Sequence, residues 1–163
     1  MKASLLLCLL LTSCGSSGSQ DYSIKLFAVN IDCSFAELVR AGIDAKFHEA
    51  GIPLVTDLYC VDWGKSYEFG EASGAVSELE AVYGDGHYLV PKFGTYFDGY
   101  QAGNSSISVA VEGRLEDSVS QASHEILHQF GAEHIFSECN LMGYYRLCDN
   151  PPILDLTLKE IGL

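Results

Sequence analysis

The sequence predicts an α/β fold, or α+β in stricter usage, built on one mixed sheet with helices packed against it. Three observations predict this fold. Residues 23–61 have the pattern strand, helix, strand, which is typical of a parallel βαβ unit. A β-forming stretch at 106–111 precedes a segment with helical spacing at 118–130. The length that remains after an N-terminal leader, about 150 residues, suits a single domain.

The elements of the first half follow from local patterns. Residues 23–31 are short, apolar and rich in β-formers, as in a buried strand. Residues 35–50 have apolar side chains at helical spacing, with Asp32 or Ser34 as the N-cap and a glycine directly after the last turn. Residues 52–61 predict a second strand, which we expect to lie parallel to the first.

The second half has shorter elements. A Gly-Asp-Gly turn at 84–86 separates a predicted short helix from the next strand, in which Pro91 weakens the prediction. Ser118 and Gln121 fit a capping box, so we expect a helix to begin there and to end before Gly131. The other predicted elements are a helix at 73–83, a strand at 88–93, an edge strand within 94–104, a strand at 106–111 and a last helix at 155–161.

The first 13 residues are typical of a secretory signal, since Lys2 precedes an apolar run that is too short to span a bilayer. The end of this run, Leu-Thr-Ser-Cys, resembles a bacterial lipobox, in which cleavage precedes the cysteine and the cysteine carries the lipid. We therefore expect a signal peptide at 1–13, a lipidated Cys14 with a flexible tether at 14–22, and one domain at 23–163. This places the domain at the bacterial cell envelope, facing the periplasm or the exterior. The alternative is ordinary secretion after a later cut.

Charge excludes two classes of partner. The chain has nine Lys and Arg against 22 Asp and Glu, a net charge of −13. Such a surface repels phosphates, which excludes the usual basic nucleic-acid binder and electrostatic docking on anionic lipid. A hydrophobic fraction of 48% also excludes a largely disordered chain.

The most informative stretch runs from His124 to His134 and reads HExxHxxGxxH. His124 and His128 are four residues apart on a predicted helix, so they lie one turn apart on one face and two imidazoles can hold one zinc ion. Glu125 points about 100° round the helix, where it can reach a water without being a ligand. A continued helix would carry His134 past the metal, so the chain has to turn, and Gly131 permits the left-handed conformation that this turn needs. Three histidine ligands leave a fourth position open, as in catalytic zinc sites.

This pattern resembles the long zinc signature of the metzincin family of metallopeptidases, which it matches at all five positions. The resemblance implies a metzincin-like twisted mixed sheet with a backing helix, an active-site helix and a small C-terminal subdomain. It implies Zn²⁺ as the cofactor, His124, His128 and His134 as its ligands, and Glu125 as the general base. By the same analogy, the stretch around 100–106 is the edge strand that pairs with an extended substrate.

A Met-turn beneath the metal is the second metzincin feature. Met142 lies eight residues after His134, and the Leu141–Met142 pair resembles the matrixin and archaemetzincin branches, although the extra zinc-binding cysteines of archaemetzincins are not matched. Tyr144 stands where several branches carry a tyrosine near the metal. The resemblance therefore implies a catalytic role for its hydroxyl on the developing oxyanion. The alternatives are that Tyr144 packs in the pocket wall or that Tyr145 takes the polar role.

Four cysteines remain beyond the leader and its flanking Cys14, and export places them where disulfides persist. Three pairings are possible. We expect Cys33 to pair with Cys60, because the ends of two adjacent parallel strands place Cα atoms about 5–6 Å apart. We expect Cys139 to pair with Cys148, which closes a short loop around Met142. Reduced buried cysteines are the alternative.

A second metal site has weak support. Asp85, His87 and Asp98 lie in a region that faintly resembles the structural-metal loop of matrixins. A turn with solvated polar side chains is the interpretation that we favour.

The expected function is that of a zinc-dependent metalloendopeptidase that hydrolyses peptide bonds outside the cytoplasm. Its partners would be a peptide or protein substrate and a membrane reached through the lipid on Cys14, with no nucleic acid, and we expect a monomer. Two alternatives stay open: a zinc hydrolase of a non-protein envelope substrate, and a catalytically silent zinc-binding lipoprotein. Glu125 argues against the second alternative, because a silent protein does not need a general base.

Overall fold

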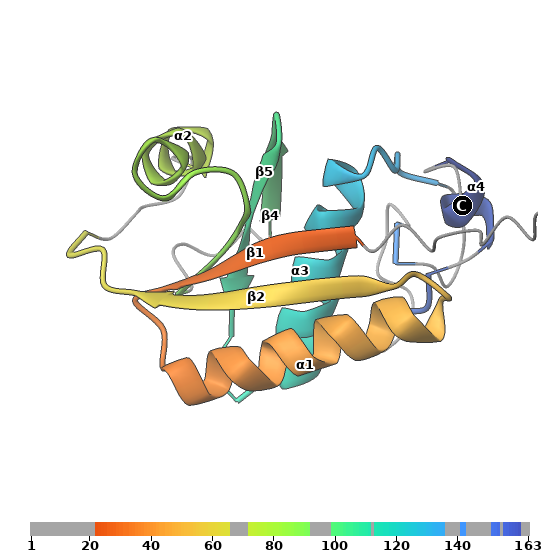
Figure 1. Ribbon diagram of the computed structural model, residues 1–163, viewed down its shortest axis with the longest axis horizontal. Helices are drawn as coiled ribbons and strands as arrows, with labels where there is room; N and C mark the ends of the chain where they lie inside the picture. The colour runs from red at the N-terminus through yellow and green to blue at the C-terminus, as the bar shows by residue number, and fades with distance from the viewer. Residues whose placement is uncertain are drawn as a thin grey trace, which may run out of the picture.

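The computed structural model describes residues 22–65, 72–91, 99–111, 113–135, 141–142, 151–153 and 155–160. In chain order the elements are β1 (Tyr22–Val29), α1 (Cys33–Glu49), β2 (Leu54–Val61), α2 (Ala72–Tyr83), β3 (His87–Pro91), β4 (Gly99–Ala102), β5 (Ser105–Ala110), α3 (Leu115–Gln129) and α4 (Asp155–Glu160) (Figure 1).

The five strands form one mixed sheet in the order β2-β1-β3-β5-β4. β1 pairs in parallel with both β2 and β3, and β3 pairs in parallel with β5. β4 runs antiparallel to β5 and forms one edge of the sheet. The predicted α/β class, the parallel βαβ unit at the start and the edge strand within 94–104 are therefore confirmed.

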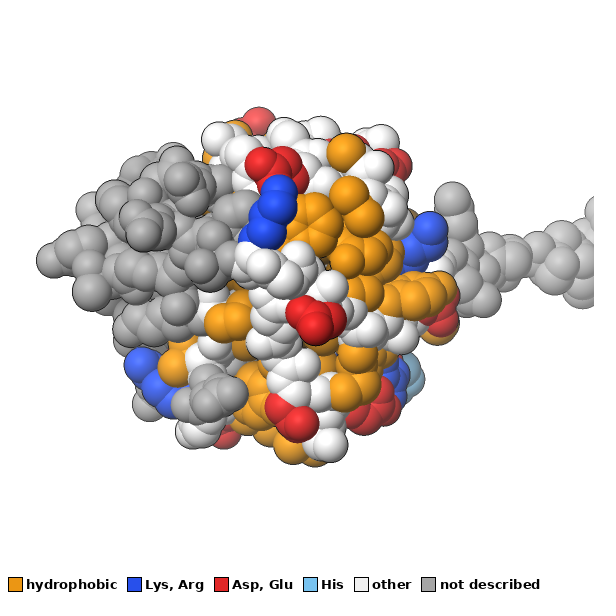
Figure 2. All heavy atoms as spheres, turned by 90° about the vertical axis from the view of Figure 1, so that its left-hand side faces the viewer, with side chains coloured by type: hydrophobic (Ala, Val, Ile, Leu, Met, Phe, Trp, Pro, Cys, Tyr) orange, Lys and Arg blue, Asp and Glu red, His pale blue; other side chains and the backbone are white. Residues whose placement is uncertain are grey.

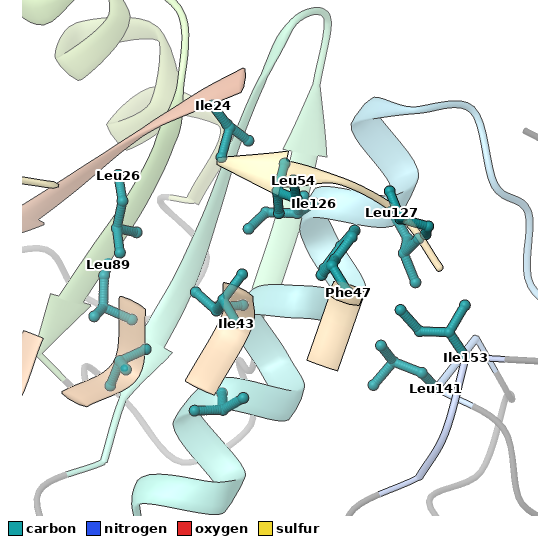
Figure 3. Close-up of a cluster of buried hydrophobic side chains, with 14 of the residues drawn as sticks. Ile24, Leu26, Ile43, Phe47, Leu54, Leu89, Ile126, Leu127, Leu141 and Ile153 are labelled. Carbon is teal, nitrogen blue, oxygen red and sulfur yellow. The ribbon is translucent and has the colours of Figure 1, made fainter. Parts of the chain in front are cut away.

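Helices α1 and α3 cover one face of the sheet, and α2 lies on the opposite side (Figure 1). α1 and α3 cross closely, because a Cβ atom at Gly42 would lie 2.5 Å from Cγ2 of Val119. The main hydrophobic cluster fills the space between these helices and the sheet, and Figure 3 shows Leu141 and Ile153 beside one another at one end of it. The segment after the third histidine thus shares the core of α3.

A second hydrophobic cluster lies on the other face of the sheet, under α2. Its centre is aromatic: the Phe27 ring stacks on Tyr59 and on Tyr88, with ring centroids 5.2 Å apart in each pair. Hydrophobic side chains also reach the surface at this end of the molecule, with carboxylates between them (Figure 2). Val82 on α2 and Tyr59 on β2 are exposed there.

Asp32 is the N-cap of α1, where its carboxylate accepts a hydrogen bond from the Phe35 amide at 3.0 Å. The predicted capping box of α3 is wrong: the helix begins at Leu115, three residues before Ser118. The Ser118 hydroxyl is fully buried and accepts a hydrogen bond from the Val111 amide at 2.9 Å. It therefore joins the end of β5 to the first turn of α3 and is not free to cap.

Cys33 and Cys60 form a disulfide with their Cα atoms 5.8 Å apart. Cys33 is the first residue of α1, not the end of a strand, so the disulfide joins this helix to β2. Cys14, Cys139 and Cys148 lie outside the described residues, and the predictions on them stay predictions. No described helix has the length and apolar character that crossing a membrane requires.

Candidate metal centre

The last turns of α3 position the first two histidines, and a Schellman motif ends this helix. The Gly131 amide donates to the His128 carbonyl and the Ala132 amide to the Leu127 carbonyl, each at 3.0 Å. Gly131 has a φ of +92°, in the region that favours glycine. The chain therefore leaves the helix axis at the predicted residue and returns with His134 toward the face of the helix that bears the other two histidines.

The Nε2 atoms of the three histidines converge on one point. They lie 3.0 Å apart between His124 and His134, 3.2 Å between His124 and His128, and 3.3 Å between His128 and His134. Zn–N bonds of about 2.0–2.1 Å in tetrahedral geometry require N···N separations of about 3.3–3.4 Å. Among the described residues, these three form a group that could hold a metal ion, and their spacing fits zinc.

Backbone carbonyls fix the tautomer of two of these histidines. Nδ1 of His124 donates to the Leu141 carbonyl and Nδ1 of His128 donates to the Ala132 carbonyl, each at 2.7 Å. A carbonyl only accepts, so the proton must be on Nδ1 and the lone pair on Nε2 faces the metal position. Such partners orient a ligand imidazole and raise its basicity.

Both of these imidazoles are held neutral. Burial lowers the pKa of His124 to about 4, although its bond to the Leu141 carbonyl opposes the shift and the two neighbouring histidines add to it. Burial also lowers the pKa of His128, against the effect of its bond to Ala132. Because a metal binds the neutral ring, these shifts prepare the pair for a metal at neutral pH.

Leu141 and Met142 connect the site to the C-terminal part. The Met142 side chain is fully buried, and its carbonyl accepts a hydrogen bond at 2.9 Å from the amide of Ile135, the residue after the third histidine. The Leu141 amide donates to the Pro152 carbonyl at 2.8 Å. Residues 143–150 lie outside the described part, so the Met-turn as a whole and Tyr144 stay predictions.

A buried lysine supports the same segment from α1. Lys46 is 8% exposed, and its Nζ donates to the Pro151 carbonyl at 2.9 Å. Pro151 precedes Pro152, whose carbonyl accepts the hydrogen bond from the Leu141 amide. The Leu141 carbonyl in turn orients the His124 ring. The sequence gives no sign of this connection, since its links are backbone carbonyls that any residue could supply.

Glu125 follows His124 in the sequence and is largely buried, at 8% exposure. Its side chain packs against Gly99, the first residue of the edge strand β4. The side chain of the predicted general base therefore lies between the helix that carries two of the histidines and the strand expected to bind substrate.

The interpretation of His87 as a solvated polar side chain is wrong. The ring is fully buried on β3, with Nδ1 2.6 Å from the Ser106 hydroxyl and Nε2 2.8 Å from the Ser108 hydroxyl. Both nitrogens are engaged, so the ring is not placed as a metal ligand. Gln129, next to His128, donates to the same Ser106 hydroxyl. Asp98 lies outside the described residues.

Comparison with known proteins supports the fold. No protein-family model and no curated protein matches the sequence. Among solved structures, the chain is similar to archaemetzincin from Methanopyrus kandleri, with a TM-score of 0.64 and 14% identity. The match covers 89% of this chain and 95% of that one. The chain thus has an archaemetzincin-like fold, as the metzincin resemblance implies.

Proposed function

We propose that this protein is a zinc-dependent metalloendopeptidase. The observation that carries the proposal is the convergence of three Nε2 atoms within 3.0–3.3 Å of one another at α3, the helix in which Glu125, the residue after His124, is largely buried. The fold adds support, because it is similar to that of an archaemetzincin. Three protein ligands leave a coordination position open for chemistry, which a structural zinc site would close.

The chemistry divides between the ion and the chain. Zinc, when bound by His124, His128 and His134, supplies a Lewis acid that polarises a carbonyl and lowers the pKa of a water toward about 7. As the oxygen of the attacking water bonds to the scissile carbonyl carbon, the Glu125 carboxylate accepts a proton from that water. The same carboxyl then donates that proton to the amine nitrogen as the C–N bond breaks.

Substrate binding is assigned to β4. Its one described partner is β5, and an extended peptide on the other side would add a strand to the sheet through backbone hydrogen bonds. Such pairing accepts peptides of many sequences. The substrate is therefore a peptide or protein in extended conformation, and Tyr144 is proposed to donate to its carbonyl oxygen.

The location of the enzyme is part of the proposal. The lipobox-like sequence before Cys14 supports a lipid anchor on a bacterial membrane, with the domain facing the periplasm or the exterior. Metabolic labelling with a palmitate analogue tests this, because Cys14→Ser should abolish the labelling and release the protein from membranes.

The experiment that tests the activity uses Glu125→Gln with a matched control. The variant should keep its zinc and lose about 10²–10⁴-fold in turnover of a peptide library, because the amide cannot take the proton. Glu116→Gln removes an exposed carboxylate from the same helix and should change nothing. Near-wild-type proteolysis by Glu125→Gln, or no zinc-dependent proteolysis by the unaltered protein, would overturn the proposal.

A further inference from the structure

A side chain at Gly99 would collide with the side chain of Glu125. A Cβ atom at this position would lie 2.5 Å from both Cγ and Cδ of Glu125 and would also collide with Oε1. Real Cβ atoms do not approach other heavy atoms so closely, so any side chain at residue 99 would have to displace the Glu125 carboxylate or the strand.

The backbone at Gly99 does not itself require glycine. Six other glycines of the described chain have a positive φ, and Gly99 does not. It pairs with Ser108 as an ordinary member of the antiparallel β4–β5 ladder. What the glycine supplies is therefore space beside one side chain.

This space decides where the Glu125 carboxylate can lie. β5 packs under α3 and its Ser108 is fully buried, so the edge strand cannot move toward the sheet to make room. Glu125 has its backbone on α3, one residue after His124, so a Cβ atom at residue 99 would displace the Glu125 side chain and leave the helix in place. The backbone of β4 at Gly99 thus forms a wall against the Glu125 side chain.

We propose that Gly99 is a positioning residue, whose missing side chain lets the β4 backbone hold the Glu125 carboxylate in the position that its role as general base requires. The proposal rests on the proposed function for its catalytic consequence. A displacement of about 1 Å in a reacting group can cost about 10²-fold in rate. Gly99→Ala should therefore lower kcat by about 10²-fold, with KM and zinc content nearly unchanged.

The first test needs no catalysis. Gly99→Ala should lower Tm by roughly 5–10 °C, as overpacking at a filled site does. In a Glu125→Ala background, which removes all three colliding atoms, the same substitution should lower Tm by about 2 °C or less. Gly74→Ala is the matched control, because Gly74 lies on α2 with open space around its Cβ position and no positive φ, and it should not lower Tm. An equal Tm loss in both backgrounds would show that residue 99 does not act through Glu125 and would overturn the inference.

The second test separates positioning from loss of the site. Cobalt replaces zinc in the unaltered protein and in Gly99→Ala, and the visible absorption of the cobalt forms should agree, because the histidine ligands do not move. A changed cobalt spectrum, or a rise in KM with kcat unchanged, would contradict the inference. If Gly99→Ala fails to fold, recovery of folding in the double variant with Glu125→Ala supports the inference, and failure of both variants refutes it. An unaltered protein that binds zinc but cleaves no peptide would refute the proposed function alone, since the Tm comparison still decides the role of Gly99.

Discussion

The buried ring of His87 makes the stability of the domain depend on pH in a way that can be calculated. His87 lies on β3 under α3, with no exposed surface and with serine hydroxyls at both nitrogens. Burial lowers the pKa of His87 to about 3. In the unfolded chain a histidine has a pKa of about 6.5. The imidazole is therefore neutral in the folded protein over a range of pH in which the unfolded chain carries the proton.

The sign follows from which state binds more protons. Between about pH 6.5 and about pH 3 the unfolded chain binds the additional proton, so the free energy of unfolding falls as the pH falls through this window. Each pH unit well inside the window costs about 1.4 kcal/mol. From about pH 7 to about pH 4.5, His87 should remove about 2.6 kcal/mol of stability.

Denaturant unfolding of the unaltered protein and of His87→Gln at the two pH values measures this contribution. The variant should be less stable than the unaltered protein at neutral pH. Between about pH 7 and about pH 4.5, however, its free energy of unfolding should fall by about 2.6 kcal/mol less than that of the unaltered protein. The three histidines of the candidate metal centre are the same in both proteins, so their contribution cancels in the difference. His48→Gln, an exposed position on α1, is the control and should behave as the unaltered protein does. An equal loss of stability in His87→Gln and the unaltered protein would refute the reasoning.

Three further predictions concern other parts of the molecule. His128→Ala should lose most of its zinc by metal analysis, because two neutral ligands hold the ion poorly; a full complement of zinc would refute the ligand assignment. Replacing Cys33 and Cys60 by serine opens a loop with a sequence separation of 27 and should cost about 3.5 kcal/mol, or roughly 10 °C in Tm; an unchanged melting curve would show that the disulfide contributes nothing. Lys46→Met leaves the buried Pro151 carbonyl without this donor and should cost about 1–3 kcal/mol in denaturant unfolding and weaken zinc binding in a competition titration; unchanged zinc affinity would show that the metal site does not depend on this contact.

Local chemistry explains why most of the fold could be predicted from the sequence. The strands and helices of residues 22–61 have strong periodicity, a capping Asp32 and a terminating Gly51, and all of these signals act within a few residues. The convergence of the three histidines could be predicted for a similar reason, because helix geometry places His124 and His128 together and Gly131 turns the chain. Such features depend on near neighbours in the sequence.

The features that could not be predicted depend on distant neighbours. The Ser118 hydroxyl looks like a cap, but the approach of β5 gives it the Val111 amide as a partner. Leu141 orients His124 through a carbonyl, an atom that every residue has and that no pattern marks. Gly99 lies in a stretch rich in glycine and tyrosine where the sequence predicts an edge strand, and only the packing of β4 against α3 shows what the small size of this glycine is for.

The carbonyl partners of His124 and His128 determine how short a segment of this chain could still form the metal site. One carbonyl, that of Ala132, belongs to the turn inside the signature, whereas the other, that of Leu141, comes from a segment anchored to residues 151–152 and through them to α1. A peptide cut out around the HExxHxxGxxH stretch would carry all three imidazoles but only half of the support that orients them. The HExxHxxGxxH segment alone therefore lacks part of what orients its histidines. Grafting it onto another helix would transfer the ligands without the carbonyl that orients the first of them, and a designed zinc hydrolase on this plan would need a counterpart of Leu141.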